Sequence, residues 1–534
     1  MGKIAIIPIL LLVLSTGNAQ SQNPVRGIIP KPVSVTSLGT ESVPVGRRLY
    51  YDTVFRRQAI YLKELMVTQF GTNLELTESL PANGGGIVLK LHKGQKPEAY
   101  TLEARAAAIT ISAADIRGVV NGIQTLIQLL PPNGGGALQV PSVLIKDHPR
   151  FAYRGMHLDV VRHFFGVDYI KKYIDYLTFH KFNTFHWHLT DDQGWRLEMQ
   201  SYPKLNSIGS WRAETLVGHF RDQPARYDGT PYGGYYTRAQ IADVLAYASV
   251  RGITVIPEID IPGHSRAIIA SYPELSTQPD TTWNVATTWG MYNRQNNVLA
   301  PKPATFQFLE TVFSEIADLF PSEYIHVGGD ECSKLWWKRD AATQQFMRDK
   351  GLKDEAALQT YFIEQVAGYL ARKGKKIIGW HEIMEGELNK QTVVMNWATD
   401  KQAIAAVKKG YRVIMTPGKP LYFDNYQTPQ PGDSLAIHGY NSVEAVYSFN
   451  PVPAALKGSQ ARQIIGAQGN VWTEYMAYPS KVDYMIFPRM TALSEALWTP
   501  VERKNFDDFT DRLNRFMVPR YQSWGSSYYA GSAR

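Results

Sequence analysis

Residues 324–331 read Tyr-Ile-His-Val-Gly-Gly-Asp-Glu. The stretch combines a short, largely apolar run, a pair of glycines, and two adjacent acids, Asp330 and Glu331. A short apolar run bounded by glycine is typical of a buried strand that ends in a turn. Acids directly after such a strand are typical of parallel β/α folds, whose strands all end at one face. If the chain folds in this way, the same unit should recur along it.

The unit recurs between about residue 150 and residue 470, where eight short apolar runs occur, most of them separated by a helical pattern. The runs lie at 155–160, 184–189, 253–259, 324–327, 376–379, 393–396, 412–415 and 464–467. Before the third run, Thr237 and Gln240 form a capping box that predicts a helix start. Eight strand–helix units predict an α/β fold, a (β/α)8 TIM barrel. A doubly wound open sheet is the alternative, but it needs a glycine-rich turn after the first strand that this sequence lacks.

The residues on either side of the predicted barrel do not repeat the strand–helix pattern. Residues 24–149 predict a small α+β domain, with β-like runs and helical patterns at 54–70, 87–91, 99–102, 108–111 and 116–130. The predicted order is therefore an N-terminal domain at 24–149, a catalytic barrel at 150–500, and a C-terminal helix and tail at 501–534.

The composition excludes several classes of protein. With 534 residues, 44% of them hydrophobic and 19% charged, the chain can bury a large core and is not of a disordered type. The net charge is +8, but the basic residues are scattered, which indicates a solvated surface and no nucleic-acid partner. The single cysteine, Cys332, excludes an intramolecular disulfide, and we expect it to be a packed thiol.

Residues 1–19 have the pattern of a secretory signal peptide. A basic start with Lys3 is followed by an apolar run at 4–14, and small residues stand at Gly17 and Ala19, where a signal peptidase reads. We therefore predict cleavage after Ala19 and export to the periplasm or the extracellular space. The apolar run is too short to span a bilayer, so no integral membrane segment is expected.

Polar and aromatic side chains follow the carboxyl end of nearly every apolar run. They are His157, Asp159, His188, Asp191, Asp192, Glu258, Asp260, His264, Asp330, Glu331, Trp380, His381, Glu382, Trp397, Trp472 and Glu474. Barrel enzymes build their active sites at this face from the ends of several strands. The recurrence favours an enzyme, and carboxylates beside tryptophans suggest carbohydrate chemistry.

The neighbouring acids Asp330 and Glu331 do not suit a standard retaining glycosidase, whose two carboxyl groups face each other about 5–5.5 Å apart across the bond. They can divide the work instead. Glu331 can reach the leaving oxygen as a general acid, while Asp330 turns toward a group of the same sugar. An acetamido group fits, because its carbonyl oxygen can attack C1 and form an oxazolinium ion that a carboxylate holds.

Four motifs, in this order, resemble those of glycoside hydrolase family 20, the β-N-acetylhexosaminidases. They are His-Trp-His-Leu-Thr-Asp-Asp-Gln-Gly-Trp-Arg at 186–196, Pro-Gly-His at 262–264, His-Val-Gly-Gly-Asp-Glu at 326–331, and Trp-Thr-Glu at 472–474. The likeness extends over about 150–500, and the 24–149 domain is similar to the family's small N-terminal domain. It implies an exo-acting enzyme that hydrolyses terminal β-linked GlcNAc or GalNAc from glycans, with retention and by the substrate-assisted route.

The resemblance also implies catalytic roles. Asp330 matches the acid that orients the acetamido group, and Glu331 matches the general acid/base. Asp191 and His264 match a relay that bears on Glu331. Tyr422 matches the donor to the acetamido oxygen.

Further matches imply a sugar-binding set. Arg154 matches the arginine that grips the O3 and O4 hydroxyls, and Asp424 matches a hydroxyl binder. Glu474 matches the residue that holds O4 and O6. The aromatic walls match Trp380, Trp397 and Trp472.

Three alternatives to this interpretation fit parts of the sequence. His186 and His188 with Asp191 could bind a metal, but no third and fourth ligand stand at diagnostic spacing, so we expect neither metal nor cofactor. A lacto-N-biosidase-like enzyme that releases a disaccharide shares the motifs but needs a longer pocket. A non-catalytic glycan-binding protein is disfavoured by the intact Asp330–Glu331 pair.

Overall fold

The computed structural model describes residues 24–79, 85–132, 136–430 and 432–533. It contains a closed barrel of eight parallel strands preceded by a domain built on a seven-stranded sheet. The predicted α/β barrel with a small N-terminal α+β domain is therefore confirmed. The predicted signal peptide at 1–19 lies outside the described residues.

The N-terminal domain is a mixed sheet covered by helices. The strand order is β1-β7-β5-β6-β4-β2-β3. The elements are β1 (Ser34–Pro44), β2 (Arg48–Tyr51), α1 (Arg56–Phe70), β3 (Glu75–Thr77), β4 (Gly86–Leu91), β5 (Tyr100–Arg105), β6 (Ala108–Ala113), α2 (Ile116–Leu129) and β7 (Gln139–Asp147). Helix α2 starts where the Asp115 side chain accepts from the Gly118 backbone N–H. It lies directly on the sheet, since a Cβ at Gly122 would be 2.4 Å from Ile111 Cγ2.

The barrel closes in the order β16-β17-β18-β19-β20-β21-β8-β9. Its strands are β8 (Tyr153–Asp159), β9 (Thr184–His188), β16 (Thr254–Glu258), β17 (Tyr324–His326), β18 (Lys376–Trp380), β19 (Val393–Asn396), β20 (Arg412–Met415) and β21 (Ile464–Gly469). All eight coincide with the predicted runs to within a few residues. Because every pair is parallel, all eight carboxyl ends meet at one face.

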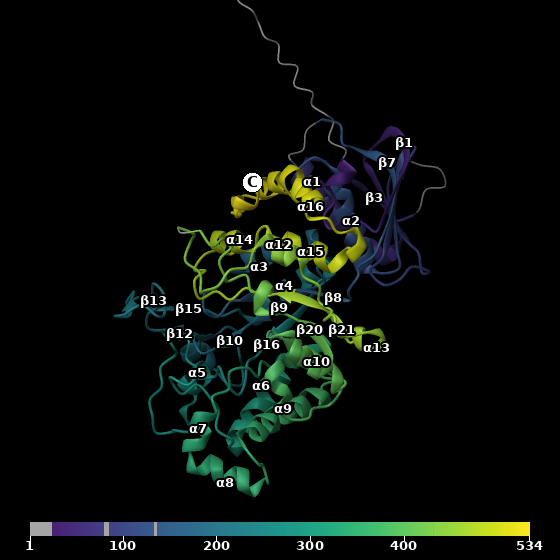
Figure 1. Cartoon of the computed structure of the whole chain (residues 1–534). Helices are drawn as coiled ribbons and strands as arrows, with labels where there is room; N and C mark the ends of the chain where they lie inside the picture. The colour runs from purple at the N-terminus through teal and green to yellow at the C-terminus, as the bar shows by residue number, and fades with distance from the viewer. Residues whose placement is uncertain (1–23, 80–84, 133–135, 431, 534) are drawn as a thin grey trace, which may run out of the picture.

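Helices surround the barrel, as Figure 1 shows. The longer ones are α3 (Val167–Phe179), α4 (Arg238–Val250), α6 (Pro303–Leu319), α9 (Glu355–Arg372), α10 (Asp400–Lys408) and α15 (Arg489–Trp498). The shorter ones are α5 (Arg266–Ser271), α7 (Lys334–Arg339), α8 (Ala341–Asp349), α11 (Gly418–Leu421), α12 (Val443–Ser448), α13 (Gly458–Ala461) and α14 (Pro479–Ile486). The predicted capping box of Thr237 and Gln240 is confirmed at the start of α4.

An insertion follows β9 at the face where the strands end. It consists of short hairpin strands: β10 (Thr190–Asp191), β11 (Gly194–Trp195), β12 (Trp211–Arg212), β13 (Leu216–Val217), β14 (Arg226–Tyr227) and β15 (Tyr232–Gly233). Strands β12, β13 and β15 project to one side of the barrel (Figure 1). The tip of this insertion contacts a strand-end loop across the face, because the Phe220 backbone N–H donates to the Tyr475 hydroxyl at 3.0 Å.

The C-terminal segment is more than a helix and tail, because it joins the two domains. Helix α16 (Phe506–Arg512) continues through a π-helical turn (Leu513–Met517) into α17 (Val518–Ser523). Arg520 donates to backbone carbonyls at the end of α2, and Figure 1 shows α16 beside the N-terminal domain. No helix in the described ranges is both long and apolar enough to cross a membrane.

Candidate active site

The Asp330–Glu331 pair follows β17, where the backbone has an unusual conformation. Glu331 has a φ of +44°, and His264, after β16, has a φ of +45°, a region that few non-glycine residues occupy. Gly328 has a φ of +65°, and a Cβ there would lie 1.7 Å from Asp260 Oδ1, so only glycine fits. Strained positions of this kind cluster at functional sites. The backbone therefore holds both acids at the face where the barrel strands end.

His264 lies among the carboxylates of this face. Its Nε2 is 3.7 Å from Asp330 Oδ2 and 3.7 Å from Glu331 Oε2, and its Nδ1 is 2.9 Å from Asp191 Oδ1. Burial disfavours the charged imidazole, but Asp191 and Asp260 outweigh this effect and raise the pKa of His264 well above its ordinary value. The structure thus brings together the predicted relay of Asp191 and His264 with Glu331, on which it bears, and with Asp330 beside it. Their roles remain predictions.

The two neighbouring acids have different surroundings. Burial raises the pKa of Asp330 to about 7, against the effect of His264 and with the help of Glu382 and Glu258. The Glu331 side chain, by contrast, is 47% exposed. Asp330 Oδ1 is buried and has no hydrogen-bond partner within the described chain. When one of two neighbouring carboxyl groups is buried and the other is exposed, the two can take different roles. One can transfer protons while the other contacts the substrate.

The structure corrects one predicted residue, Arg154. It lies at the beginning of β8, at the opposite end of the barrel from the acids, and is 2% exposed. Its guanidinium donates to the carbonyls of Lys181 and Phe151 and to Glu98 of the N-terminal domain. Arg154 therefore joins the two domains and cannot reach a sugar bound at the carboxyl ends.

Arg162 occupies the place expected for Arg154. It follows the carboxyl end of β8, and its guanidinium lies 2.8 Å from Asp191 and 3.3 Å from Asp159. It also lies over the Trp472 ring, 5.1 Å from the centroid. An arginine fork beside a ring and carboxylates suits recognition of sugar hydroxyls. Arg162 is thus the site residue that our sequence analysis missed.

The predicted aromatic residues gather beside these groups. The Trp472 ring lies 6.0 Å from Trp380 and 6.4 Å from Tyr422, between ring centroids. The Trp397 indole N–H donates to Glu382. Trp380 is fully buried, whereas Trp397 and Trp472 are partly exposed and pack against its cluster. Trp397 and Trp472 therefore offer the accessible ring surface, with Trp380 behind them.

Two further acids, Asp424 and Glu474, face the same space. Burial raises the pKa of both side chains, and the charge of Glu474 raises the pKa of Asp424 further. Arg162 acts in the opposite direction on both. Asp424 Oδ1 and Glu474 Oε2 are buried acceptors without a partner among the described residues. Buried acceptors of this kind can accept hydrogen bonds from the hydroxyl groups of a bound sugar.

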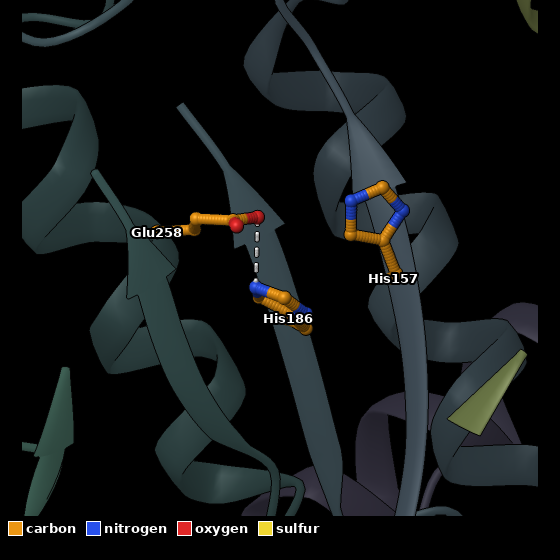
Figure 2. Close-up of side chains that lie close together, drawn as sticks. All are labelled: His157, His186 and Glu258. Carbon is orange, nitrogen blue, oxygen red and sulfur yellow. Dashed lines mark ion pairs between the residues drawn. The ribbon is translucent and has the colours of Figure 1, made fainter. Parts of the chain in front are cut away.

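Three groups of side chains have the composition of a metal site, but several of their atoms already contact other side chains. Asp191 and His264 belong to the relay, and Asp330 lies beside it. The third group is His157, His186 and Glu258 (Figure 2). There His186 Nε2 faces Glu258 at 3.1 Å, while its Nδ1 contacts Gln468. The expectation of no metal stays a prediction.

The comparisons with known proteins agree with this geometry. The catalytic-domain model of glycosyl hydrolase family 20 matches residues 151–501, and the model of that family's domain 2 matches residues 25–148. A β-hexosaminidase of Porphyromonas gingivalis is 43% identical over 81% of this chain, which spans only 55% of that protein. A β-hexosaminidase of Vibrio furnissii is 37% identical over 88% of this chain and 76% of its own.

Solved structures give the same result. An exo β-N-acetylglucosaminidase from Vibrio harveyi, solved with N-acetylglucosamine, has a TM-score of 0.84 at 33% identity, covering 95% of this chain and 78% of that one. A Streptomyces plicatus β-hexosaminidase mutant in complex with GlcNAc has a TM-score of 0.81 at 32% identity, covering 95% and 97%. The chain is therefore a glycoside hydrolase and belongs to glycosyl hydrolase family 20.

Proposed function

We propose that the protein is an exo-acting β-N-acetylhexosaminidase that removes terminal β-linked GlcNAc or GalNAc from the non-reducing end of glycans. The observation that carries the proposal is the pairing of a buried acid, Asp330, with an exposed one, Glu331, around His264. The relatives named as β-hexosaminidases support the same activity.

In the proposed mechanism the substrate's acetamido oxygen attacks C1. The bond from C1 to the leaving oxygen breaks, and Glu331 gives its proton to that oxygen. Asp330 aligns the acetamide through its free Oδ1 and balances the positive oxazolinium ion that forms. Water then attacks C1 and gives a proton to Glu331, while the bond from C1 to the acetamido oxygen breaks and the acetamide is restored. Two inversions at C1 give overall retention.

The hydroxyl-binding groups support recognition of a terminal sugar. Asp424 and Glu474 each present a buried oxygen without a partner in the described ranges, and Arg162 lies beside Glu474. The insertion after β9 contacts Tyr475, the residue after Glu474. A second sugar attached beyond Glu474 would collide with the contact between Phe220 and Tyr475. This favours the release of one sugar residue at a time.

We also propose that the protein acts outside the cytoplasm. The proposal rests on the signal-peptide pattern of residues 1–19. N-terminal sequencing of the protein recovered from the periplasm or the medium tests it, and an intact Met1 on protein retained in the cytoplasm would refute it.

The activity test compares four chromogenic β-glycosides: those of GlcNAc, GalNAc, glucose and lacto-N-biose. We expect turnover of the first two and almost none of the glucoside, which lacks the internal nucleophile. Preferred release of the disaccharide would favour a lacto-N-biosidase-like enzyme. Binding without turnover of any substrate would overturn the proposal in favour of a glycan-binding protein.

A further inference from the structure

A single buried carboxylate, Glu258, lies at the centre of the barrel beneath the acids. It ends β16 and has no exposed surface. His186 and His188 of β9 approach its Oε2 at 3.1 and 2.5 Å, and His326 of β17 approaches its Oε1 at 3.0 Å. The indole N–H of Trp380, at the end of β18, donates to Oε1 at 2.8 Å. Three barrel strands thus direct nitrogen atoms at one carboxylate.

His188 connects this carboxylate to the relay. Its Nδ1 lies 2.5 Å from Glu258, and its Nε2 lies 3.0 Å from Asp191. Because each ring nitrogen faces a carboxylate oxygen, both can donate only if the ring is an imidazolium. Asp191 in turn contacts His264, which lies 3.7 Å from Glu331. One line of side chains therefore runs from Glu258 to the exposed acid.

Trp380 connects the same carboxylate to the sugar wall. With its N–H held by Glu258, the indole lies 6.0 Å from the Trp472 ring, between centroids. Trp380 is fully buried, so its ring has no freedom to turn without breaking the bond to Glu258. Glu258 therefore contacts both the tryptophan behind the sugar wall and the histidine that leads to the relay.

Stability alone does not explain the group of side chains around Glu258. A buried ion pair is often no more stable than apolar side chains of similar volume, because desolvation offsets the attraction. A metal site is also disfavoured: in Figure 2 His186 points at Glu258, while the His157 ring lies on the neighbouring strand without a contact to the carboxylate. His157 Nδ1 instead lies 3.2 Å from the Val471 backbone N–H.

We propose that Glu258 is a positioning residue of the hydrolase: it fixes the His188 ring, and through it the Asp191–His264 relay, and it fixes the Trp380 indole behind the sugar wall. The proposal rests on the glycosidase function proposed above. Glu258 itself touches no substrate.

The charges around the cluster define what its removal should do. Burial lowers the pKa of His157 well below its ordinary value and that of His186 to about 4, so both are neutral. Burial also opposes the charge of His188, but Glu258 and Asp191 together outweigh burial and raise the pKa of His188 to about 10. The inner layer therefore holds one anion, Glu258, and one cation, His188, and His326 is the remaining titratable neighbour of Glu258.

The outer layer responds to the same carboxylate. The charge of Glu258 adds to the effect of burial in raising the pKa of Asp330, whereas His264 lowers it. Arg162, Asp192 and Asp260 are the other titratable groups close to Asp191 and His264. Neutralising Glu258 should lower the pKa of Asp330 and also that of His188, which loses its nearest anion.

The test is Glu258→Gln, which keeps shape and removes charge, measured on a chromogenic GlcNAc glycoside from pH 4 to 10. We expect kcat to fall roughly 10²-fold through misplaced relay groups, with KM changed less. The acid limb of the kcat profile should move to lower pH, and a new ionisation, that of His188, should appear below pH 10. The matched control is Gln468→Met, in the same buried layer, which contacts His186 but neither His188 nor Trp380. Its profile should superimpose on the wild type.

Several outcomes would overturn the proposal. One is a Glu258→Gln profile that superimposes on the wild type, and another is an equal loss in Gln468→Met. If Glu258→Gln does not fold, ¹⁵N-histidine NMR of the wild type decides, with His188→Gln used to assign the signal. Both His188 nitrogens should be protonated at pH 7, and a neutral ring would refute the idea. Inactivity of the wild type on GlcNAc glycosides would instead refute the function on which this proposal rests.

Discussion

The two ends of strand β8 each carry an arginine, and the two have opposite uses. Arg154, at the amino end, donates to two backbone carbonyls and to Glu98, so its contacts hold the N-terminal domain to the barrel. Arg162, beyond the carboxyl end, lies among Asp159, Asp191 and the Trp472 ring. Residue type alone does not identify a site residue in a barrel. The end of the strand does, because only one end faces the substrate.

The same contrast applies to the whole barrel. At the amino end, charges are paired across domains, as with Lys181 and Asp147, whose side chains are fully buried 3.2 Å apart. At the carboxyl end, buried acceptors of Asp330, Asp424 and Glu474 lack partners within the described residues. Substitutions at the carboxyl end should therefore cost activity, and those at the amino end should cost stability.

Glu331→Gln should have the largest effect on activity. The variant cannot protonate the leaving oxygen, so we expect kcat to fall roughly 10²–10⁴-fold on substrates with poor leaving groups. Good leaving groups need less protonation and should lose less. The measurement compares kcat on aryl glycosides of graded leaving-group pKa, with circular dichroism as the check on folding. An equal loss across the series would contradict an acid role.

Asp330→Asn should come next. The amide keeps a hydrogen bond but not the charge that balances the oxazolinium ion, so kcat should fall roughly 10²–10³-fold and more than KM rises. The wild type should also slow steeply from the N-acetyl to the N-trifluoroacetyl glucosaminide, whose carbonyl is a weaker nucleophile. Equal rates on the two would point to an enzyme carboxylate as nucleophile.

The same variant should change the pH dependence of stability. Burial raises the pKa of folded Asp330 to about 7, above its ordinary value of 3.8. The folded chain therefore keeps a proton that the unfolded chain has released, and this stability is present below about pH 4 and lost as the pH rises through 7. Asp330→Asn cannot ionise, so its free energy of unfolding should exceed that of the wild type by about 4 kcal/mol at pH 8 but not at pH 4. Urea unfolding at the two pH values measures the difference.

Arg154→Met and Arg162→Met test the comparison between the strand ends directly. Arg154→Met removes one of the partners of the buried Glu98, which keeps Arg117 and Asn183, so we expect a stability loss of about 1–3 kcal/mol while kcat/KM of the folded protein stays near the wild-type value. Arg162→Met should lower kcat/KM about 10- to 100-fold. Its stability loss should be smaller, because Asp191 keeps His188 and His264. The reverse pattern would return Arg154 to the site.

Much of this arrangement follows from the sequence, because the barrel strands are short apolar runs whose ends carry the acids. The miss at Arg162 was avoidable: Arg154 precedes the apolar run 155–160, whereas Arg162 follows it. Strand β1 (Ser34–Pro44) could not be predicted from its pattern, because ten of its eleven residues are not buried and it is held by pairing with β7. The contacts of Glu258 join residues from four strands, and no local spacing reveals them.

Removal of divalent metal ions should have the smallest effect of all, namely none on kcat/KM. Two groups of candidate ligands lie near the acids: Asp191, Asp192 and His264, and Asp260, His264 and Asp330. In the first group the oxygens already accept from Arg162, from His264 and from the Asn297 side chain. Both groups need His264, whose raised pKa favours the imidazolium, a form that cannot bind a metal. Activity measured after dialysis against EDTA should equal that of the untreated enzyme. A loss that Zn²⁺ or Ca²⁺ restores would mean that a metal, and not His264, holds these carboxylates together at the carboxyl end.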